Sequence, residues 1–173
     1  MPTSYQAPRR SDSERSKEVS QSAASNLSAG TGKVKDIIRK KGDDVFSIRP
    51  QDTLGNAVQL LSEKRIGALI VADANGTLLG ILSERDIVRK LAETPGRTLP
   101  QKVEEVMTAN VEVCTRDEPL ISVLRRMTEG RFRHMPVMED NRLVGIVTIG
   151  DVVNHRLNEL EFEALQLKQL IVG

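Results

Sequence analysis

The sequence predicts an α/β protein, of the α+β kind, in which a βαββα unit occurs twice and is followed by an extended C-terminal helix. One heptapeptide pattern occurs at residues 80–86 and again at 145–151: a glycine, two aliphatic residues, a hydroxyl residue, two variable residues and an aspartate. The surrounding chain repeats as well, because residues 54–71 align without a gap with residues 120–137. Two copies are too few for a solenoid, so the repeat indicates a paired, pseudosymmetric module.

Composition divides the 173 residues into five segments. Residues 1–32 hold eight serines, mixed charges and few apolar side chains. They are predicted to be a disordered tail, because they bury too little apolar surface to offset the entropy lost on folding. The first repeat is expected at residues 33–93 and the second at residues 102–157. Two prolines and a glycine mark the linker between them, residues 94–101. Residues 158–173 are predicted to extend the last helix beyond the repeat.

The elements of each copy follow from apolar spacing and turn residues. The first copy is expected to contain a short helix that begins near Lys33 and ends at Gly42, a strand at 45–48, a helix at 54–64 capped by Thr53, a strand at 68–72, a hairpin turn at 73–76, a return strand at 78–82 and a helix that begins at Asp86. The second copy repeats this order, with its hairpin turn at residues 139–142.

The last helix continues past the end of the repeat. Its apolar residues alternate in steps of four and three, the spacing of a heptad seam: Val153, Leu157, Leu160, Ala164, Leu167 and Ile171. A helix that packs only on its own module is one interpretation. A contact between two copies of the chain is the other, and it is favoured because the seam outlasts the repeat.

Composition excludes several classes of protein. Lys and Arg number 25 against 24 Asp and Glu, so no basic excess recruits nucleic acid or an anionic membrane. There is no Trp, one Tyr and three Phe, too few for a base-stacking surface. The one cysteine, Cys114, forms neither an intrachain disulfide nor a cysteine metal cluster. No apolar run reaches the ~18 residues of a membrane span, and the N-terminus has no apolar secretory core, so a cytoplasmic protein is expected.

The repeated heptapeptide in its context resembles the CBS domain family, whose tandem pairs are also called Bateman modules. Both copies carry the closing motif in register. Residues 47–50 of the first copy resemble the family's opening strand and proline, and residues 133–137 of the second resemble its middle strand. The resemblance covers about residues 34–157 and is to a stand-alone, bacterial-type pair. It implies two CBS domains packed sheet against sheet about a pseudo-twofold axis, and a homodimer of such pairs.

The resemblance also implies a function. CBS pairs bind adenosine-containing ligands in the clefts between their copies and regulate an attached or separate protein. The implied role is a non-enzymatic sensor that passes its occupancy to an unidentified protein partner. AMP is the expected ligand, with ADP, ATP, NAD(H) and S-adenosylmethionine as alternatives, and no metal is expected.

The residues at the two motifs suit a nucleotide. Asp86 and Asp151 can accept hydrogen bonds from a ribose diol, and Ser83 and Thr148 add hydroxyls at helix N-termini that favour a phosphate. Apolar residues of the opening strands, Val111 among them, would line an adenine slot. The expected nucleotide-binding residues are Ser83, Arg85, Asp86, Val45, Phe46, Ser47, Ala68, Val113, Arg133, His134, Thr148 and Asp151.

The two copies differ beside the motif aspartate. Arg85 precedes Asp86, whereas Gly150 precedes Asp151. An arginine at this position can pair with a phosphate. Two unequal clefts are therefore expected, one that holds a phosphate through Arg85 and one that holds it through the region of Arg133.

The motifs also allow an interpretation without any ligand. Ser83 and Asp86, like Thr148 and Asp151, have the spacing of a capping box, which stabilises a helix by itself. The alternative function is a ligand-independent dimerisation and assembly module. An enzyme is not expected, because the sequence shows no nucleophile beside a base, no metal-ligand cluster and no pair of catalytic carboxylates.

Overall fold

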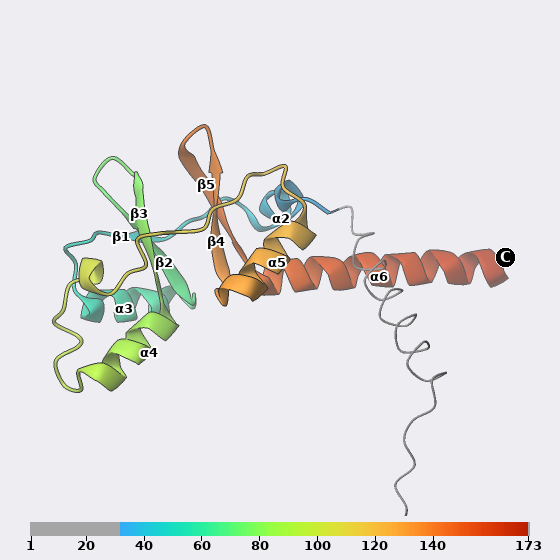
Figure 1. The fold of residues 1–173 in the computed structure, drawn as a ribbon. Helices are drawn as coiled ribbons and strands as arrows, with labels where there is room; N and C mark the ends of the chain where they lie inside the picture. Colours follow the sequence, from blue (N-terminus) through green and yellow to red (C-terminus); the bar gives the residue numbers. More distant parts are fainter. Residues whose placement is uncertain (1–31, 173) are drawn as a thin grey trace, which may run out of the picture. The chain divides into compact units, whose positions relative to one another are not determined.

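The computed structural model describes residues 32–172 (Figure 1). The predicted tail lies outside the described residues except for Gly32, and so does Gly173 at the end of the predicted extension. The elements, in chain order, are α2 (Val34–Lys41), β1 (Ser47–Ile48), α3 (Leu54–Lys64), β2 (Ala68–Ala72), β3 (Leu78–Ser83), α4 (Glu84–Glu93), a 3-10 turn η1 (Val103–Glu105), α5 (Leu120–Gly130), β4 (His134–Glu139), β5 (Arg142–Thr148) and α6 (Ile149–Val172). This mixed fold with a long C-terminal helix confirms the predicted class.

Two small sheets form the centre of the two repeats. In the first, β1 pairs with β2 in parallel and β2 pairs with β3 antiparallel. In the second, β4 and β5 pair antiparallel, and the opening strand is reduced to one parallel bridge between Cys114 and Val137. That bridge occupies the place of the Ile48 and Val71 pair in the first sheet. The predicted opening strand at 45–48 is shorter than expected, because only Ser47 and Ile48 pair with β2.

Capping hydrogen bonds at the N-termini set where the helices begin. Thr53 caps α3 by accepting a hydrogen bond from the amide of Asn56 at 3.2 Å, as predicted. The predicted start of α4 at Asp86 is wrong by two residues, since the helix begins at Glu84 directly after its N-cap, Ser83. The reason is that an N-cap serine lies just outside the helix and its partner carboxylate lies at the third helical position.

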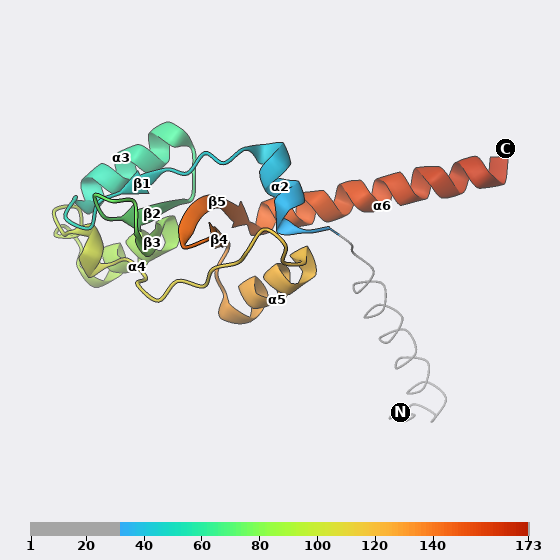
Figure 2. The ribbon, with the colours of Figure 1, turned by 90° about the horizontal axis from the view of Figure 1, so that it is seen from above.

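Each repeat is completed by a segment that precedes the other repeat's opening strand. Val34, Ile37 and Ile38 of α2 lie in the hydrophobic core of the second repeat, beside Met127 and Met135. Both ribbon views place α2 next to β5 and α6 (Figures 1 and 2). Apolar burial thus joins the start of the first repeat to the body of the second.

The reciprocal contact joins η1 to the first repeat. Val103 is fully buried in the core that contains Leu54 and Leu69. The amide of Val103 donates to the Asp52 carbonyl at 2.9 Å, and in the second repeat the amide of Val34 donates to the Glu118 carbonyl at 3.0 Å. The exchange of segments therefore follows the same pseudosymmetry as the repeats.

The motif glycines receive these exchanged segments. A Cβ atom on Gly145 would lie 2.6 Å from Cδ1 of Ile38, and one on Gly80 would lie 2.8 Å from Sδ of Met107. Real Cβ atoms do not approach so closely, so only glycine leaves room for the incoming side chain. The first residue of the heptapeptide is thus explained by packing.

Candidate functional site

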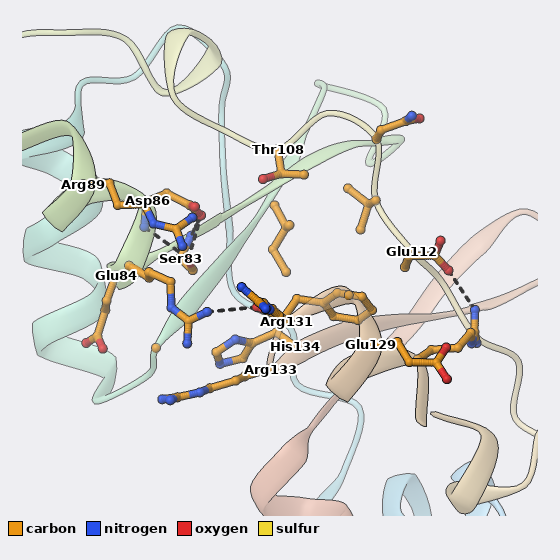
Figure 3. A pocket seen from close by; sticks show the side chains of 18 residues that line it. Ser83, Glu84, Asp86, Arg89, Thr108, Glu112, Glu129, Arg131, Arg133 and His134 are labelled. Atoms are coloured by element: carbon orange, nitrogen blue, oxygen red, sulfur yellow. Dashed lines mark hydrogen bonds and ion pairs between the residues drawn. The ribbon is translucent and has the colours of Figure 1, made fainter. Parts of the chain in front are cut away.

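A pocket of about 600 Å³ lies between the two repeats. One wall is the junction of β3 and α4, which carries Ser83 and Asp86, and the opposite wall is the turn from α5 into β4. The segment from Thr108 to Glu112 supplies a third wall. Figure 3 shows Ser83 and Asp86 on one side of the pocket, with Arg131 and His134 across from them. The motif of the first repeat therefore faces the body of the second.

The carboxylate of Asp86 has one oxygen engaged by the capping box. Oδ2 accepts hydrogen bonds from the Ser83 amide at 2.9 Å and from Ser83 Oγ at 2.6 Å, and Ser83 Oγ accepts from the Asp86 amide at 3.4 Å. Every bond that the described residues donate to this carboxylate falls on Oδ2. Oδ1 is left for another donor, so the helix cap and a ligand contact are compatible in the same side chain.

Arg85 ties the two repeats together across the pocket. Its Nη1 donates to the backbone carbonyl of Arg131 at 2.9 Å. Arg131 is the C-cap of α5 and has a left-handed backbone, with φ of 57°. This bond satisfies a carbonyl at the helix end that would otherwise lack a partner, so Arg85 positions the opposite wall of the pocket.

Three further arginines line the pocket without an ion pair. These are Arg89, Arg131 and Arg133, whose guanidinium groups have no carboxylate within bonding distance among residues 32–172. Arg126 also lines it, but that guanidinium is held by Glu118 at 2.7 Å and Glu112 at 3.0 Å. Unpaired guanidinium groups suit an anion that accepts two parallel hydrogen bonds, such as a phosphate or a carboxylate.

His134 lies at the centre of the contact between the repeats. A Cβ atom on Gly67 would lie 3.3 Å from its ring, so the imidazole packs directly on the backbone of the first repeat. Burial, followed by the charges of Lys41 and Arg133, lowers the pKa of His134, and Asp151 offsets this only in part. The ring is therefore neutral near pH 7, with one donor and one acceptor nitrogen.

The second motif differs from the first because its aspartate forms an ion pair with a lysine. Thr148 and Asp151 form the same reciprocal cap, with bonds of 2.9 and 3.1 Å. Lys41, at the end of α2, donates to Asp151 Oδ2 at 2.8 Å. Burial would raise the pKa of Asp151, but the hydrogen bonds from Lys41 and the Thr148 amide and the lysine charge outweigh it and hold that pKa below its usual value. The exchanged helix thus neutralises the second aspartate.

Five of the predicted nucleotide-binding residues line the pocket: Ser83, Arg85, Asp86, Arg133 and His134. Seven others are not part of its lining: Val45, Phe46, Ser47, Ala68, Val113, Thr148 and Asp151. Phe46 packs on the first core and Ala68 is buried in β2, opposite Ser83. Arg85 and Arg133, which were expected to hold phosphates in separate clefts, line the same pocket.

Several residues that line the pocket were not predicted from the sequence. Arg89, Thr108, Asn110 and Phe132 line the pocket, and none belongs to the repeated heptapeptide. Arg89 lies one helical turn after Arg85, so the amphipathic spacing of α4 was an available signal. Thr108 and Asn110 reach the pocket because Thr108 forms a β-bridge with Ile81 of β3. This pairing joins the two repeats, and no local sequence pattern predicts it.

In the part of the chain that the structure describes, no helix combines the length and apolar content needed to cross a bilayer. Likewise, residues 32–172 contain no group of three or more His, Cys, Asp or Glu side chains placed to hold a metal ion.

Comparison with known proteins agrees with this architecture. A family model described as the CBS domain matches residues 34–93 and 103–158. The crystal structure of a CBS-domain-containing protein from Agrobacterium tumefaciens is 43% identical, covers 72% of this chain and 99% of its own, and superposes with a TM-score of 0.71. The mitochondrial CBS domain-containing protein CBSX3 of Arabidopsis thaliana is 30% identical over 148 residues, which is 81% of this chain and 72% of that protein.

One solved relative carries ligands. The CBS domain pair of protein MJ0100, in complex with 5′-methylthioadenosine and S-adenosyl-L-methionine, is 31% identical, covers 71% of this chain and 98% of its own, and has a TM-score of 0.64. Since the family model matches both repeats and solved CBS-domain proteins superpose on most of this chain, the chain belongs to the CBS domain family, as a tandem pair of CBS domains.

Proposed function

We propose that this CBS pair is a non-enzymatic regulatory module that binds an adenosine-containing ligand in the pocket at Asp86 and transmits its occupancy to a partner protein. The observation that carries the proposal is the Asp86 carboxylate, which caps α4 with one oxygen and leaves the other open in a pocket between the repeats. A carboxylate in this position accepts hydrogen bonds from ribose hydroxyls. The complex of the MJ0100 pair with two adenosine compounds supports the class of ligand.

The charges of the pocket favour a phosphorylated ligand. Arg89, Arg131 and Arg133 line it without carboxylate partners among the described residues. Placing a phosphate among them forms charge-assisted hydrogen bonds, whereas 5′-methylthioadenosine has no anionic group to offer. AMP is therefore the leading ligand, with ADP, ATP and NAD(H) as alternatives, and no metal is required.

The two motifs are proposed to bind unequally. Asp151 already accepts a hydrogen bond from Lys41 at 2.8 Å, and a ligand hydroxyl would have to compete with that ion pair. Thr148 and Asp151 are accordingly assigned to a second, weaker site. The expected stoichiometry at low ligand concentration is one molecule per chain.

Isothermal titration calorimetry of the purified protein tests the proposal. The panel is AMP, ATP, NADH, S-adenosylmethionine and 5′-methylthioadenosine. At least one phosphorylated member should bind, and it should bind more tightly than 5′-methylthioadenosine. Absence of binding by every member at millimolar concentration would refute the proposed function.

Two matched variants locate the site. Asp86→Asn removes a charged acceptor worth about 1.5–3 kcal/mol and should weaken binding by about 10- to 100-fold. Asp151→Asn changes the equivalent capping residue of the other repeat and should leave the first binding event unchanged. Equal weakening by both substitutions would show that the effect comes from helix capping and not from ligand contact.

A ligand-independent assembly module is the second candidate function. The observation that favours it is the row of exposed leucines on α6, which is typical of a contact surface. If it is correct, Asp86→Asn lowers stability by about 1 kcal/mol, as a damaged cap does, and partner affinity stays unchanged. We also propose a homodimer working in the reducing cytoplasm, which suits a chain with one cysteine.

A further inference from the structure

Beyond its first turns, α6 has an apolar surface that nothing in residues 32–172 covers. The first turn is anchored, since Val152 is only 3% exposed and Ile149 packs on the second core. Beyond it, Leu157, Leu167 and Ile171 are 54%, 60% and 83% exposed. Both ribbon views show these turns running on past the other described elements (Figures 1 and 2). Exposed apolar surface on this scale marks a contact with another molecule.

The seam residues have the order of a two-stranded coiled coil. In heptad notation, positions d hold Val153, Leu160 and Leu167, and positions a hold Leu157, Ala164 and Ile171. Leucine at d together with a β-branched residue at a, as at Leu167 and Ile171, favours two strands over higher assemblies. The seam spans most of the 24 residues of α6, in one unbroken helix. The surface is therefore shaped for a second helix of matching spacing.

The charged residues that flank the seam select the orientation of that second helix. In a parallel pair in register, each position g faces position e of the partner's next heptad. Glu163 then faces the partner's Lys168, and Arg156 faces the partner's Glu161. Arg156 also donates a hydrogen bond to Glu159 on its own helix at 3.0 Å. The pair of Glu163 with the partner's Lys168 therefore gives the more direct test of the orientation.

The antiparallel arrangement lacks this complementarity. A pair that overlaps the same turns places Glu161 opposite its own copy and Glu163 opposite its own copy. Like charges in contact across an interface oppose association. The charges thus specify a second copy of the chain in parallel register.

Other occupants fit less well. A helix that lies on an anionic membrane carries Lys and Arg on its polar face, whereas the exposed turns here carry Glu161 and Glu163 against one lysine, Lys168. The chain's own residues 1–31 contain few large apolar side chains to cover the seam. We propose that α6 pairs with α6 of a second copy in a parallel, in-register, two-stranded coiled coil. The proposal rests on α6 alone and not on ligand binding.

Sedimentation velocity of the full chain tests the pairing. The wild type should sediment as a dimer at micromolar concentration. Leu167→Glu, on the seam, should weaken dimerisation by at least about a hundredfold because it places two carboxylates in contact. Leu165→Glu is the matched control, since Leu165 is 58% exposed, close to the 60% of Leu167, but lies off the seam. A monomeric wild type, or equal effects of the two substitutions, would overturn the proposal.

A cysteine variant and a charge exchange test the orientation. Ile171→Cys should form a covalent dimer on mild oxidation, because in parallel register each new thiol faces its copy, while Cys114 is buried and does not compete. Glu163→Lys alone should weaken the dimer, and adding Lys168→Glu should restore it. No covalent dimer, or a charge exchange that fails to restore association, would contradict parallel register.

Discussion

Replacing Lys41 by methionine is predicted to release the aspartate of the second motif. The ion pair between Lys41 Nζ and Asp151 Oδ2 is 2.8 Å long, with side-chain exposures of 38% and 23%. Because the lysine is more than a third exposed, solvent screens the pair, and its loss should cost about 0.5–1 kcal/mol. For a chain of this size that corresponds to a fall of about 1–4 °C in the melting temperature.

The pH dependence separates this ion pair from other effects of losing a lysine. The pKa of Asp151 is lowered in the folded protein, so its contribution to stability is present above the unfolded pKa and is lost as pH falls through the folded pKa. Thermal unfolding should therefore show a gap between wild type and Lys41→Met near pH 7 that closes below about pH 4.

Lys40→Met is the matched control. Lys40 also lies in the last turn of α2, where a cation interacts with the helix dipole, but it makes no ion pair among the described residues. Equal shifts for the two variants, or a gap that does not shrink as the pH is lowered below about 4, would refute the role given to Lys41. Under the proposed function, Lys41→Met should also strengthen the second ligand-binding event measured by calorimetry.

Three further outcomes follow from packing. Gly80→Ala should destabilise the fold by about 1–3 kcal/mol in chemical denaturation, because its Cβ would lie 2.9 Å from the backbone oxygen of Thr108, which has little freedom to move. Gly145→Ala should cost less and should be partly rescued by Ile38→Val, which removes the methyl group at 2.6 Å; no rescue would contradict the packing account. Cys114 is 2% exposed and burial, with the charge of a nearby glutamate, raises its pKa to about 12, so a thiol reagent at pH 8 should label it only after unfolding.

Much of the fold is encoded locally and was predictable. The caps at Thr53, Ser83 and Thr148 depend on residues three apart, and these bonds formed as expected. The repeat and the apolar spacing predicted two similar units and the long last helix, and the structure differs in reducing the opening strand of the second unit to a single bridge. Such features depend on neighbours within a turn or a hairpin, where sequence spacing equals spatial proximity.

The candidate site was predictable only in part. Asp86 and Ser83 were found because they belong to the repeated motif, and they do line a pocket. The pairing of Arg85 with the Arg131 carbonyl was not foreseen, since the two residues lie 46 apart in the chain. The way in which the two repeats pack together determines which arginines line the pocket. The spacing of residues in the sequence does not predict this packing.

The sequence by itself determined the two units, their capped helices and the carboxylate at each motif. Tertiary structure alone decided that the segment before each unit packs on the other, which carries Lys41 to Asp151 across 110 residues of chain and brings Thr108 to the pocket at Asp86. The physical reason is that each unit has a motif glycine whose missing side chain leaves room for another residue, Ile38 at Gly145 and Met107 at Gly80. Only the packing of the whole module determines which segment lies against which glycine. That choice makes the two similar motifs into two different sites.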